Sequence, residues 1–290
     1  MTQSSILATG IALSPYNFDT QSVSIEGVVN ARELGGYILP DGSRIRHGLL
    51  LRGGSLAQVS ESECVRIADT YKLAYVFDFR TEEEVQRAPD KTIPNCTNVW
   101  LPTIDPETEK LGTSTLPKDA YSNLIPYLLK YASVPKVQDV ARRIYTDMVI
   151  NEYTQLQYAA FLQMIAGLDE GAVYWHCRQG KDRTGLRAAF LLAALGADRD
   201  LILSDFEISN EYYREEVDSL KSYLSEQGYG AAEQAVVQTF IGVNTDYFID
   251  ALDLIDKEYG SMNDFVCNVL MLSDDDRERL RQRLLEPAID

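Results

Sequence analysis

The order of hydrophobic and polar residues predicts short buried strands that alternate with helices. Apolar runs at residues 49–51, 74–77, 98–102 and 172–175 are typical of strands buried in a sheet. Helices are predicted, from apolar residues at helical spacing or from a capping box, at residues 60–71, 81–84, 137–148, 156–168, 186–195, 203–212, 243–259, 263–272 and 273–285. Strands that alternate with helices along a chain indicate an α/β fold.

Two stretches depart from this pattern. Residues 1–24 are expected to form an irregular N-terminal arm, which leaves residues 25–290 as the folded domain. Residues 103–135 hold four prolines, a glycine and several serines and threonines, which predicts an insertion or lid with a short helix at 121–131. Such a segment could gate a site beneath it, or it could be a surface excursion without a role.

Ten consecutive residues, His176 to Gly185, separate a predicted buried strand from a predicted buried helix. The strand covers residues 172–175 and the helix covers residues 186–195. Backbone amides at the start of a helix have no acceptor within that helix, and the helix dipole favours negative charge there. The connection is therefore expected to bind an anion.

The residue types in this connection fit phosphate chemistry. Cys177 would lie at a helix N-terminus beside cations, so its thiol should have a lowered pKa and act as a thiolate nucleophile. Arg183, separated from Cys177 by five residues, offers a planar fork of donors for two phosphate oxygens. Thr184 could donate its hydroxyl to the sulfur. Gly180 and Gly185 allow the backbone to approach a ligand closely.

Charge and composition restrict the possible functions. The formal net charge is −17, which argues against nucleic acid and against a general attraction to anionic membranes. Four cysteines without a Cys-x-x-Cys pair, with two histidines, argue against a zinc site, and the chain length argues against a disulfide framework. No apolar run is long enough to cross a bilayer. Residues 1–13 make a poor signal peptide, so a cytoplasmic and a secreted location both remain open.

The string His-Cys-Arg-Gln-Gly-Lys-Asp-Arg-Thr-Gly, from His176 to Gly185, resembles the signature of the cysteine-dependent tyrosine phosphatase superfamily. Its last six residues resemble the atypical microbial branch of tyrosine and lipid phosphatases. This resemblance implies a central, mostly parallel sheet flanked by helices, with a helical lid or insertion. It also implies that Cys177 takes a phosphoryl group while Arg183 and the loop amides hold the phosphate oxygens, without a metal or other cofactor.

Other segments resemble motifs of the same branch. They are Asn30-Ala31-Arg32-Glu33-Leu34-Gly35-Gly36, the segment around Arg52, Asp78-Phe79-Arg80 and Ser209-Asn210-Glu211-Tyr212. We expect Arg32 either to reach the anion or to pin its own segment through a carboxylate. Asp78 and Arg80 follow a strand, where ligands of open α/β sheets bind. Asp78 is expected to orient Arg183 or Arg80, or else to form a structural salt bridge.

The loop also has to bind substrate and supply a proton. The residues expected to bind substrate are Arg178, Gln179, Gly180, Lys181, Thr184 and Gly185, together with Asp78, Arg80 and Arg32. A general acid must protonate the leaving oxygen. The chain lacks the Trp-Pro-Asp loop of familiar superfamily members, which leaves Asp182 and Asp105 as candidates. The resemblance favours Asp182, although a carboxylate beside Arg183 and Lys181 would ordinarily be ionised.

The expected partners are a phosphotyrosine-containing protein, with dual specificity as an extension, and phosphoinositides. Lys181 suits a second phosphate on a lipid headgroup, or it balances the charge of Asp182. Two other functions stay open: a catalytically silent phosphate-binding module and a dedicated phosphoinositide or inositol phosphate phosphatase. Cys177 argues against the silent module, since binding alone needs no thiol. The sequence does not indicate an oligomeric state.

Overall fold

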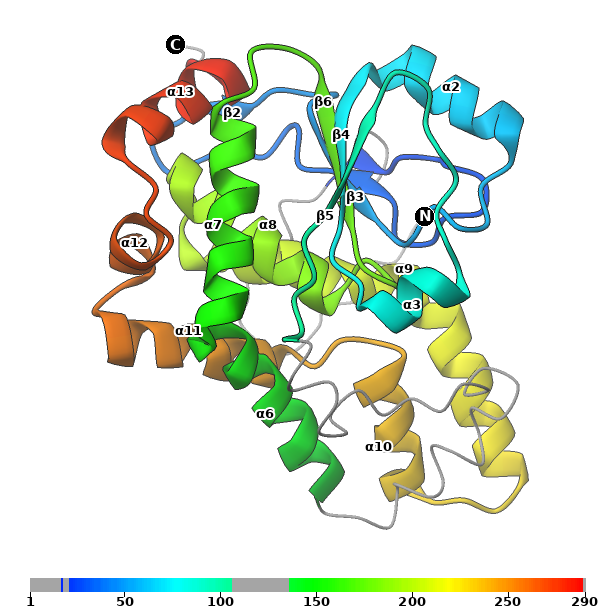
Figure 1. The fold of residues 1–290 in the computed structure, drawn as a ribbon. Coiled ribbons are helices and arrows are strands. Elements are labelled where there is room, and N and C mark those ends of the chain that lie inside the picture. The colour runs from blue at the N-terminus through cyan, green and yellow to red at the C-terminus, as the bar shows by residue number, and fades with distance from the viewer. Residues whose placement is uncertain (1–16, 18–20, 106–135, 289–290) are drawn as a thin grey trace, which may run out of the picture.

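A five-stranded sheet forms the centre of the protein (Figure 1). The computed structural model describes residues 17, 21–105 and 136–288. The strands lie in the order β1-β3-β6-β4-β5, with β1 antiparallel to β3 and every other pair parallel. Their bounds are β1 Arg32–Glu33, β3 Leu50–Gly53, β6 Ala172–His176, β4 Leu73–Asp78 and β5 Thr97–Trp100. The predicted α/β class with a mostly parallel sheet is confirmed.

Strand β6 leads into the connection from His176 to Gly185, hereafter the reactive loop, and lies in the middle of this sheet. It pairs with β3 on one side and β4 on the other, and all five of its residues are buried. Because successive side chains of a strand point to opposite faces, Trp175 joins one hydrophobic core and Tyr174 the other. Because β6 is paired on both edges and packed on both faces, it fixes the position of Cys177, the residue that follows it.

Helices cover both faces of the sheet. Helix α2 (Glu61–Tyr71) packs on one face, and α7 (Glu152–Ala166), α8 (Asp182–Leu195), α11 (Thr245–Tyr259) and α13 (Asp274–Leu284) contribute to the core on the other (Figure 1). Their starts follow from the sequence. Ser60 caps α2, and Thr81 with Glu84 forms the capping box of α3 (Glu82–Arg87). Helix α8 ends at Gly196, whose φ of 102° favours glycine.

The carboxy-terminal half differs from the prediction in three helices. Helix α9 (Arg199–Glu226) is much longer than the expected 203–212, and α10 (Ala231–Phe240) was not predicted. The two helices bury a small cluster of their own, which includes Val217, Leu224 and Val237. The segment expected as one helix at 263–272 is instead a short α12 (Met262–Asp264) followed by a π-helical turn, η2 (Phe265–Val269). Helix α6 (Lys136–Ile150) agrees with expectation.

The last residues of the expected N-terminal arm pack against the domain. Val23 is buried, and its amide donates to the carbonyl of Ala31 at 3.2 Å. A turn at residues 40–42 connects Ile38 to β2 (Arg44–Ile45), which pairs with the carboxy-terminal β7 (Leu285–Glu286). Most of the predicted insertion, including its helix at 121–131, lies outside the described residues.

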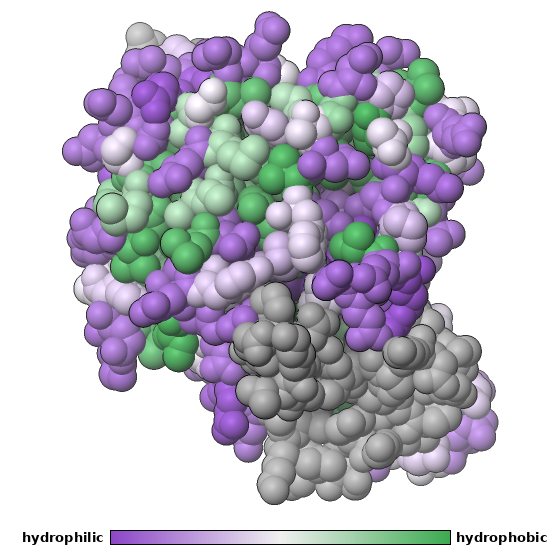
Figure 2. All heavy atoms as spheres, viewed as in Figure 1, coloured by the Kyte–Doolittle hydropathy of each residue, from purple (hydrophilic) through white to green (hydrophobic). Residues whose placement is uncertain are grey.

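The face in Figure 2 shows hydrophilic residues together with groups of hydrophobic ones. Within the described part of the chain, no helix combines the length and the hydrophobicity that a membrane span requires. All four cysteines are free thiols, and Cys64 is buried in the core as expected of a packing residue.

Candidate active site

The ten-residue connection forms a loop between the middle strand and a helix. Cys177 directly follows β6, and α8 begins at Asp182 with Lys181 before it. Gly180 has a φ of +68°, and a Cβ at this position would clash with the backbone carbonyl of Gly53. No other residue type would allow β3 to lie this close to the loop. A Cβ on Gly185 would likewise press against the ring of Phe206.

Cys177 is buried at the origin of the loop, with 3% of its surface exposed. Burial alone would raise the pKa of its thiol, but the Arg183 guanidinium and the Thr184 hydroxyl outweigh burial, so the pKa is lowered from its ordinary value of 9.0. Asp182 and Glu84 oppose this shift. The structure thus brings Cys177, Arg183, Thr184 and Asp182 together, and the thiol is biased toward the thiolate.

Arg183 is oriented by Glu84, a residue that the sequence indicated only as part of a helix cap. Its Nη1 donates to Oε2 of Glu84 at 2.5 Å and its Nη2 to Oε1 at 2.8 Å. Burial would raise the pKa of Glu84, but the charge of Arg183 and its hydrogen bonds lower that pKa to about 2. Of the two arginines that Asp78 was expected to orient, Arg183 is held by Glu84 instead, and Asp78 pairs with Arg80.

Arg32 and Arg52 share one buried carboxylate behind the loop. Arg32 Nε lies 3.3 Å from Oδ1 of Asp205, and Arg52 Nη1 lies 2.5 Å from Oδ2. Neither arginine is exposed. Burial would raise the pKa of Asp205, but Arg52 and Arg32 lower it. Of the two alternatives for Arg32, the structure shows the pinning of its segment through a carboxylate, and its assignment to substrate binding does not agree with this geometry.

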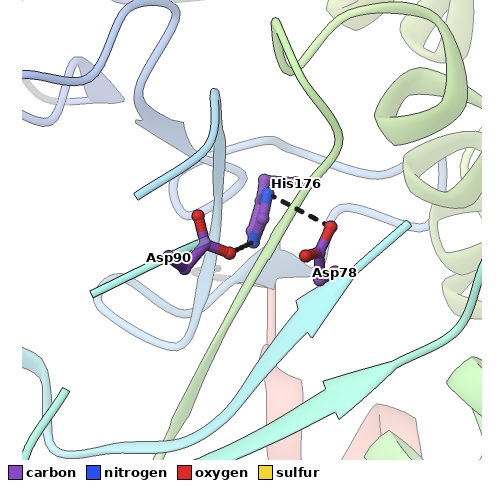
Figure 3. Close-up of side chains that lie close together, drawn as sticks. All are labelled: Asp78, Asp90 and His176. Atoms are coloured by element: carbon purple, nitrogen blue, oxygen red, sulfur yellow. Dashed lines mark ion pairs between the residues drawn. The ribbon is translucent and has the colours of Figure 1, made fainter. Parts of the chain in front are cut away.

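Asp78, Arg80, Asp90 and His176 form a second buried ion-pair group. Arg80 Nη2 lies 2.6 Å from Oδ2 of Asp78 and 2.8 Å from Oδ2 of Asp90. His176 Nε2 lies 3.0 Å from the same Asp90 oxygen, and its Nδ1 lies 3.8 Å from Asp78 (Figure 3). Burial would lower the pKa of His176, but Asp90 and Asp78 raise it.

This group supports the loop from behind. His176 Nδ1 also lies 2.9 Å from the carbonyl oxygen of Cys177. Asp78 and Arg80 are buried and directed at each other, so they too differ from their assignment to substrate binding. Three of these side chains could ligate a metal, but the Arg80 guanidinium already pairs with both carboxylates, and we assign the group as an ion-pair network.

The Lys181 side chain does not lie at the open edge of the loop, where a second phosphate would bind. Its Nζ donates to the carbonyls of Phe240, Ile241 and Gly242 at 2.6, 3.0 and 2.7 Å, which satisfies the carboxy-terminal end of α10. Burial lowers the pKa of its ammonium. Asp182 Oδ2 is 4.0 Å away. Contact with a second phosphate does not describe this arrangement, in which Lys181 joins the loop to α10, whereas the expected charge balance with Asp182 agrees with the ion pair at 4.0 Å.

Donors from distant segments hold the carbonyl oxygens of the loop. Asn30 Nδ2 donates to Gly180 at 2.9 Å and to Gln179 at 3.3 Å. The hydroxyl of Tyr213 also donates to Gln179, at 2.8 Å, and Nη2 of Arg52 donates to Gly180 at 3.0 Å. The amide of Ser55 donates to the carbonyl of Arg178 at 3.1 Å. The three successive carbonyls of Arg178, Gln179 and Gly180 therefore point toward these distant segments.

The two candidate acids lie in different surroundings. Asp182 is close enough to Cys177 to act on its pKa, and Oδ1 of Asp182 accepts a hydrogen bond from the Tyr145 hydroxyl. Asp105 lies near Tyr153, whose pKa is raised by burial and then by Asp105. The side chains of Arg178 and Gln179 are half-buried at the loop, whereas Thr184 and Gly185 are buried in its base.

Comparison with known proteins agrees with this site. A model of the tyrosine phosphatase family matches residues 23–286. A protein of Cupriavidus necator that carries the name of a tyrosine-protein phosphatase is 30% identical over 249 residues, which cover 86% of this chain and 84% of that protein. The triple specificity protein phosphatase PtpB of Mycobacterium tuberculosis is 28% identical over 245 residues, or 77% of this chain and 86% of PtpB. With most of both chains aligned and the signature loop in place, this chain belongs to the tyrosine phosphatase family.

Proposed function

We propose that this phosphatase hydrolyses phosphotyrosine by way of a cysteinyl-phosphate, with Cys177 as nucleophile, Arg183 as the phosphate-binding cation and Asp182 as general acid. One observation carries the proposal. The buried thiol of Cys177 has its pKa lowered chiefly by Arg183, which is itself fixed by Glu84. A thiolate and a guanidinium close enough to act on its charge are the parts that transfer of a phosphoryl group to sulfur requires.

The fixed carbonyls support an anion site on the opposite side of the loop. In a trans peptide the N–H of one residue points away from the C=O of the residue before it. The carbonyls of Arg178, Gln179 and Gly180 accept bonds from Ser55, Tyr213, Asn30 and Arg52. The amides of Gln179, Gly180 and Lys181 therefore point away from these donors. Such amides, with those that begin α8, would hold the phosphate oxygens.

The proposed reaction has two steps. The Cys177 thiolate attacks phosphorus, the P–O bond to the leaving group breaks, and the leaving oxygen takes the proton of Asp182. The Asp182 carboxylate then accepts a proton from water, which attacks phosphorus, and the S–P bond breaks to restore the thiolate and release phosphate. Arg183 and the amides stabilise the charge on the phosphoryl oxygens in both transition states.

Asp182 is preferred to Asp105 because of its surroundings. Its charge acts directly on Cys177, whereas that of Asp105 acts on Tyr153. The negative charge of the arriving phosphate favours the protonated carboxyl. If Asp182→Asn slowed an activated and a poorly activated ester equally, the assignment would be wrong.

Phosphoinositides are a second candidate substrate class. The relative PtpB is named for triple specificity, which supports a site that accepts several phosphomonoesters. The argument from Lys181 is weakened, because its ammonium is bound to three carbonyls. Phosphotyrosine is therefore the first substrate to test.

The decisive experiment is a hydrolysis panel. Purified protein would be assayed on phosphotyrosine, phosphoserine and phosphothreonine peptides, phosphoinositides and inositol phosphates, with Cys177→Ser as the blank. We expect phosphate release from the phosphotyrosine peptide, none with Cys177→Ser, and a trapped phosphoenzyme on rapid quenching. A parent protein that binds phosphopeptides without turnover would favour the silent binding module instead.

A further inference from the structure

A tyrosine from α6 reaches the candidate general acid. Tyr145 is 6% exposed, and its hydroxyl donates a hydrogen bond to Oδ1 of Asp182. The Asp182 side chain is 35% exposed, and its other oxygen, Oδ2, is the one directed toward Lys181. One carboxyl oxygen is thus tied to a buried phenol, while the aspartate side chain as a whole keeps 35% of its surface exposed.

The phenol itself is held by aromatic rings from two other helices. The Tyr145 ring meets Phe206 of α9 and Phe248 of α11 edge to face, at centroid distances of 6.1 and 6.4 Å, and it lies 6.3 Å from the ring of Tyr247. Phe206 and Phe248 are stacked on each other at 3.9 Å. A ring packed in this way has little rotational freedom, so its hydroxyl is a fixed donor.

We propose that Tyr145 is a positioning residue for the phosphatase reaction: it fixes Oδ1 of Asp182, so that Oδ2 carries the proton given to the leaving oxygen. The proposal rests on the proposed role of Asp182. A phenol can donate both to a carboxylate oxygen and to the carbonyl oxygen of a protonated carboxyl, so the bond persists in both steps. The proton that moves is that of Asp182, and Tyr145 keeps its own throughout.

The alternative to this fixed geometry is a rotating carboxyl group. The terminal torsion of an aspartate is broad, so without the Tyr145 bond the proton would be on the wrong oxygen, or misdirected, for part of the time. General acid catalysis depends on a proton donor within hydrogen-bond reach of the leaving atom. Loss of the hydroxyl should therefore slow the reaction only where a proton is needed.

Tyr145→Phe tests this with two substrates and a matched control. We expect kcat on phenyl phosphate, a poor leaving group, to fall about tenfold, and kcat on an activated aryl phosphate to change less than about twofold, with KM unchanged for both. Tyr247→Phe removes a hydroxyl from the same cluster, one that is buried and has no hydrogen-bond partner among the described residues. It should leave both rates as they are. Thermal midpoints of the two variants show whether either change disturbs folding.

Asp182→Asn, alone and with Tyr145→Phe, separates the possible failures. If the tyrosine acts through Asp182, the double variant should be no slower than Asp182→Asn alone. The role of Tyr145 would be overturned, and that of Asp182 would stand, if Asp182→Asn slowed mainly the reaction of phenyl phosphate while Tyr145→Phe slowed both substrates equally. The same would follow if the effects of the two substitutions were additive in the double variant. An unselective loss in Asp182→Asn would overturn both, while activity that still requires Cys177 would preserve the phosphatase assignment.

Discussion

The carboxylate of Glu84 holds the guanidinium of Arg183 at two points, with N–O distances of 2.5 and 2.8 Å. Two parallel hydrogen bonds fix the plane of a guanidinium as well as its position. Glu84 comes from the start of α3 and Arg183 from the start of α8, 99 residues apart in the chain. The pair therefore aligns two helix starts with the reactive loop.

Glu84→Gln should impair catalysis through the position of Arg183. The glutamine keeps the shape of the side chain but loses the charge and offers only one acceptor oxygen. We expect kcat/KM on a phosphotyrosine peptide to fall about 100-fold, with weaker inhibition by vanadate. Glu83→Gln, on the same helix turn, is the control, because its carboxylate pairs with Arg87 and is 49% exposed. Equal losses in the two variants would contradict the orienting role.

The same pair predicts a dependence of stability on pH. The folded protein lowers the pKa of Glu84 from 4.5 to about 2, because the effect of Arg183 outweighs that of burial. A lowered carboxyl pKa stabilises the folded state above the unfolded pKa, and this stabilisation is lost as pH falls toward the folded pKa. The difference in unfolding free energy between wild type and Glu84→Gln should thus be constant above pH 4.5 and shrink between pH 4.5 and about 2. Urea unfolding across this range measures it, and a difference that does not shrink would disprove it.

Thr184→Val should raise the pKa of Cys177. The Thr184 hydroxyl is one of the two groups that lower this pKa against burial. We expect the rate of Cys177 alkylation, followed by mass spectrometry of the peptide, to reach half its maximum below pH 9.0 in the wild type and at higher pH in the variant. Cys64 is an internal reference, since burial raises its pKa. An unchanged midpoint would show that the hydroxyl does not act on the sulfur.

Lys181→Met should affect stability more than substrate choice. The three carbonyls at the end of α10 would lose their donor, at a cost of about 1–3 kcal/mol for each group left unsatisfied and buried. We therefore expect a lower thermal midpoint, and an unchanged ratio of kcat/KM between a phosphoinositide and a phosphotyrosine peptide. A selective loss on the phosphoinositide would mean that the ammonium leaves α10 and reaches the substrate during turnover.

Much of the fold follows from local sequence signals. The strand at 172–176, the helix after it and the caps at Ser60 and Thr81 were predictable because each depends on residues adjacent in the chain. Helix α10 and the extension of α9 were missed, and their buried apolar residues pack in a cluster of their own, apart from the main core. The spacing of apolar residues predicted one regular helix at 263–272, and such spacing does not indicate a π-helical turn like the one at 265–269.

The site was predictable in its reactive residues and not in their supports. Cys177 and Arg183 belong to one short string, so their spacing is visible in the sequence. Glu84 pairs with Arg183, 99 residues away, and Asp205 pairs with Arg52, 153 residues away. In the sequence, a carboxylate at the start of a helix or within a long helix is explained by its local position, so nothing indicates the distant partner. Only the three-dimensional arrangement shows which arginine each carboxylate meets.

The donors that hold the loop carbonyls, Asn30, Arg52, Ser55 and Tyr213, come from segments far away on both sides of Cys177. Contacts of such long sequence separation form late in folding, because the chain between them must first be ordered. A ribosome-bound chain that ends before α9 would lack Tyr213 and Asp205, so it would have its nucleophile without the complete set of contacts that shapes the loop. Catalytic competence should therefore arise near the end of folding, and a partly made protein would not dephosphorylate its surroundings.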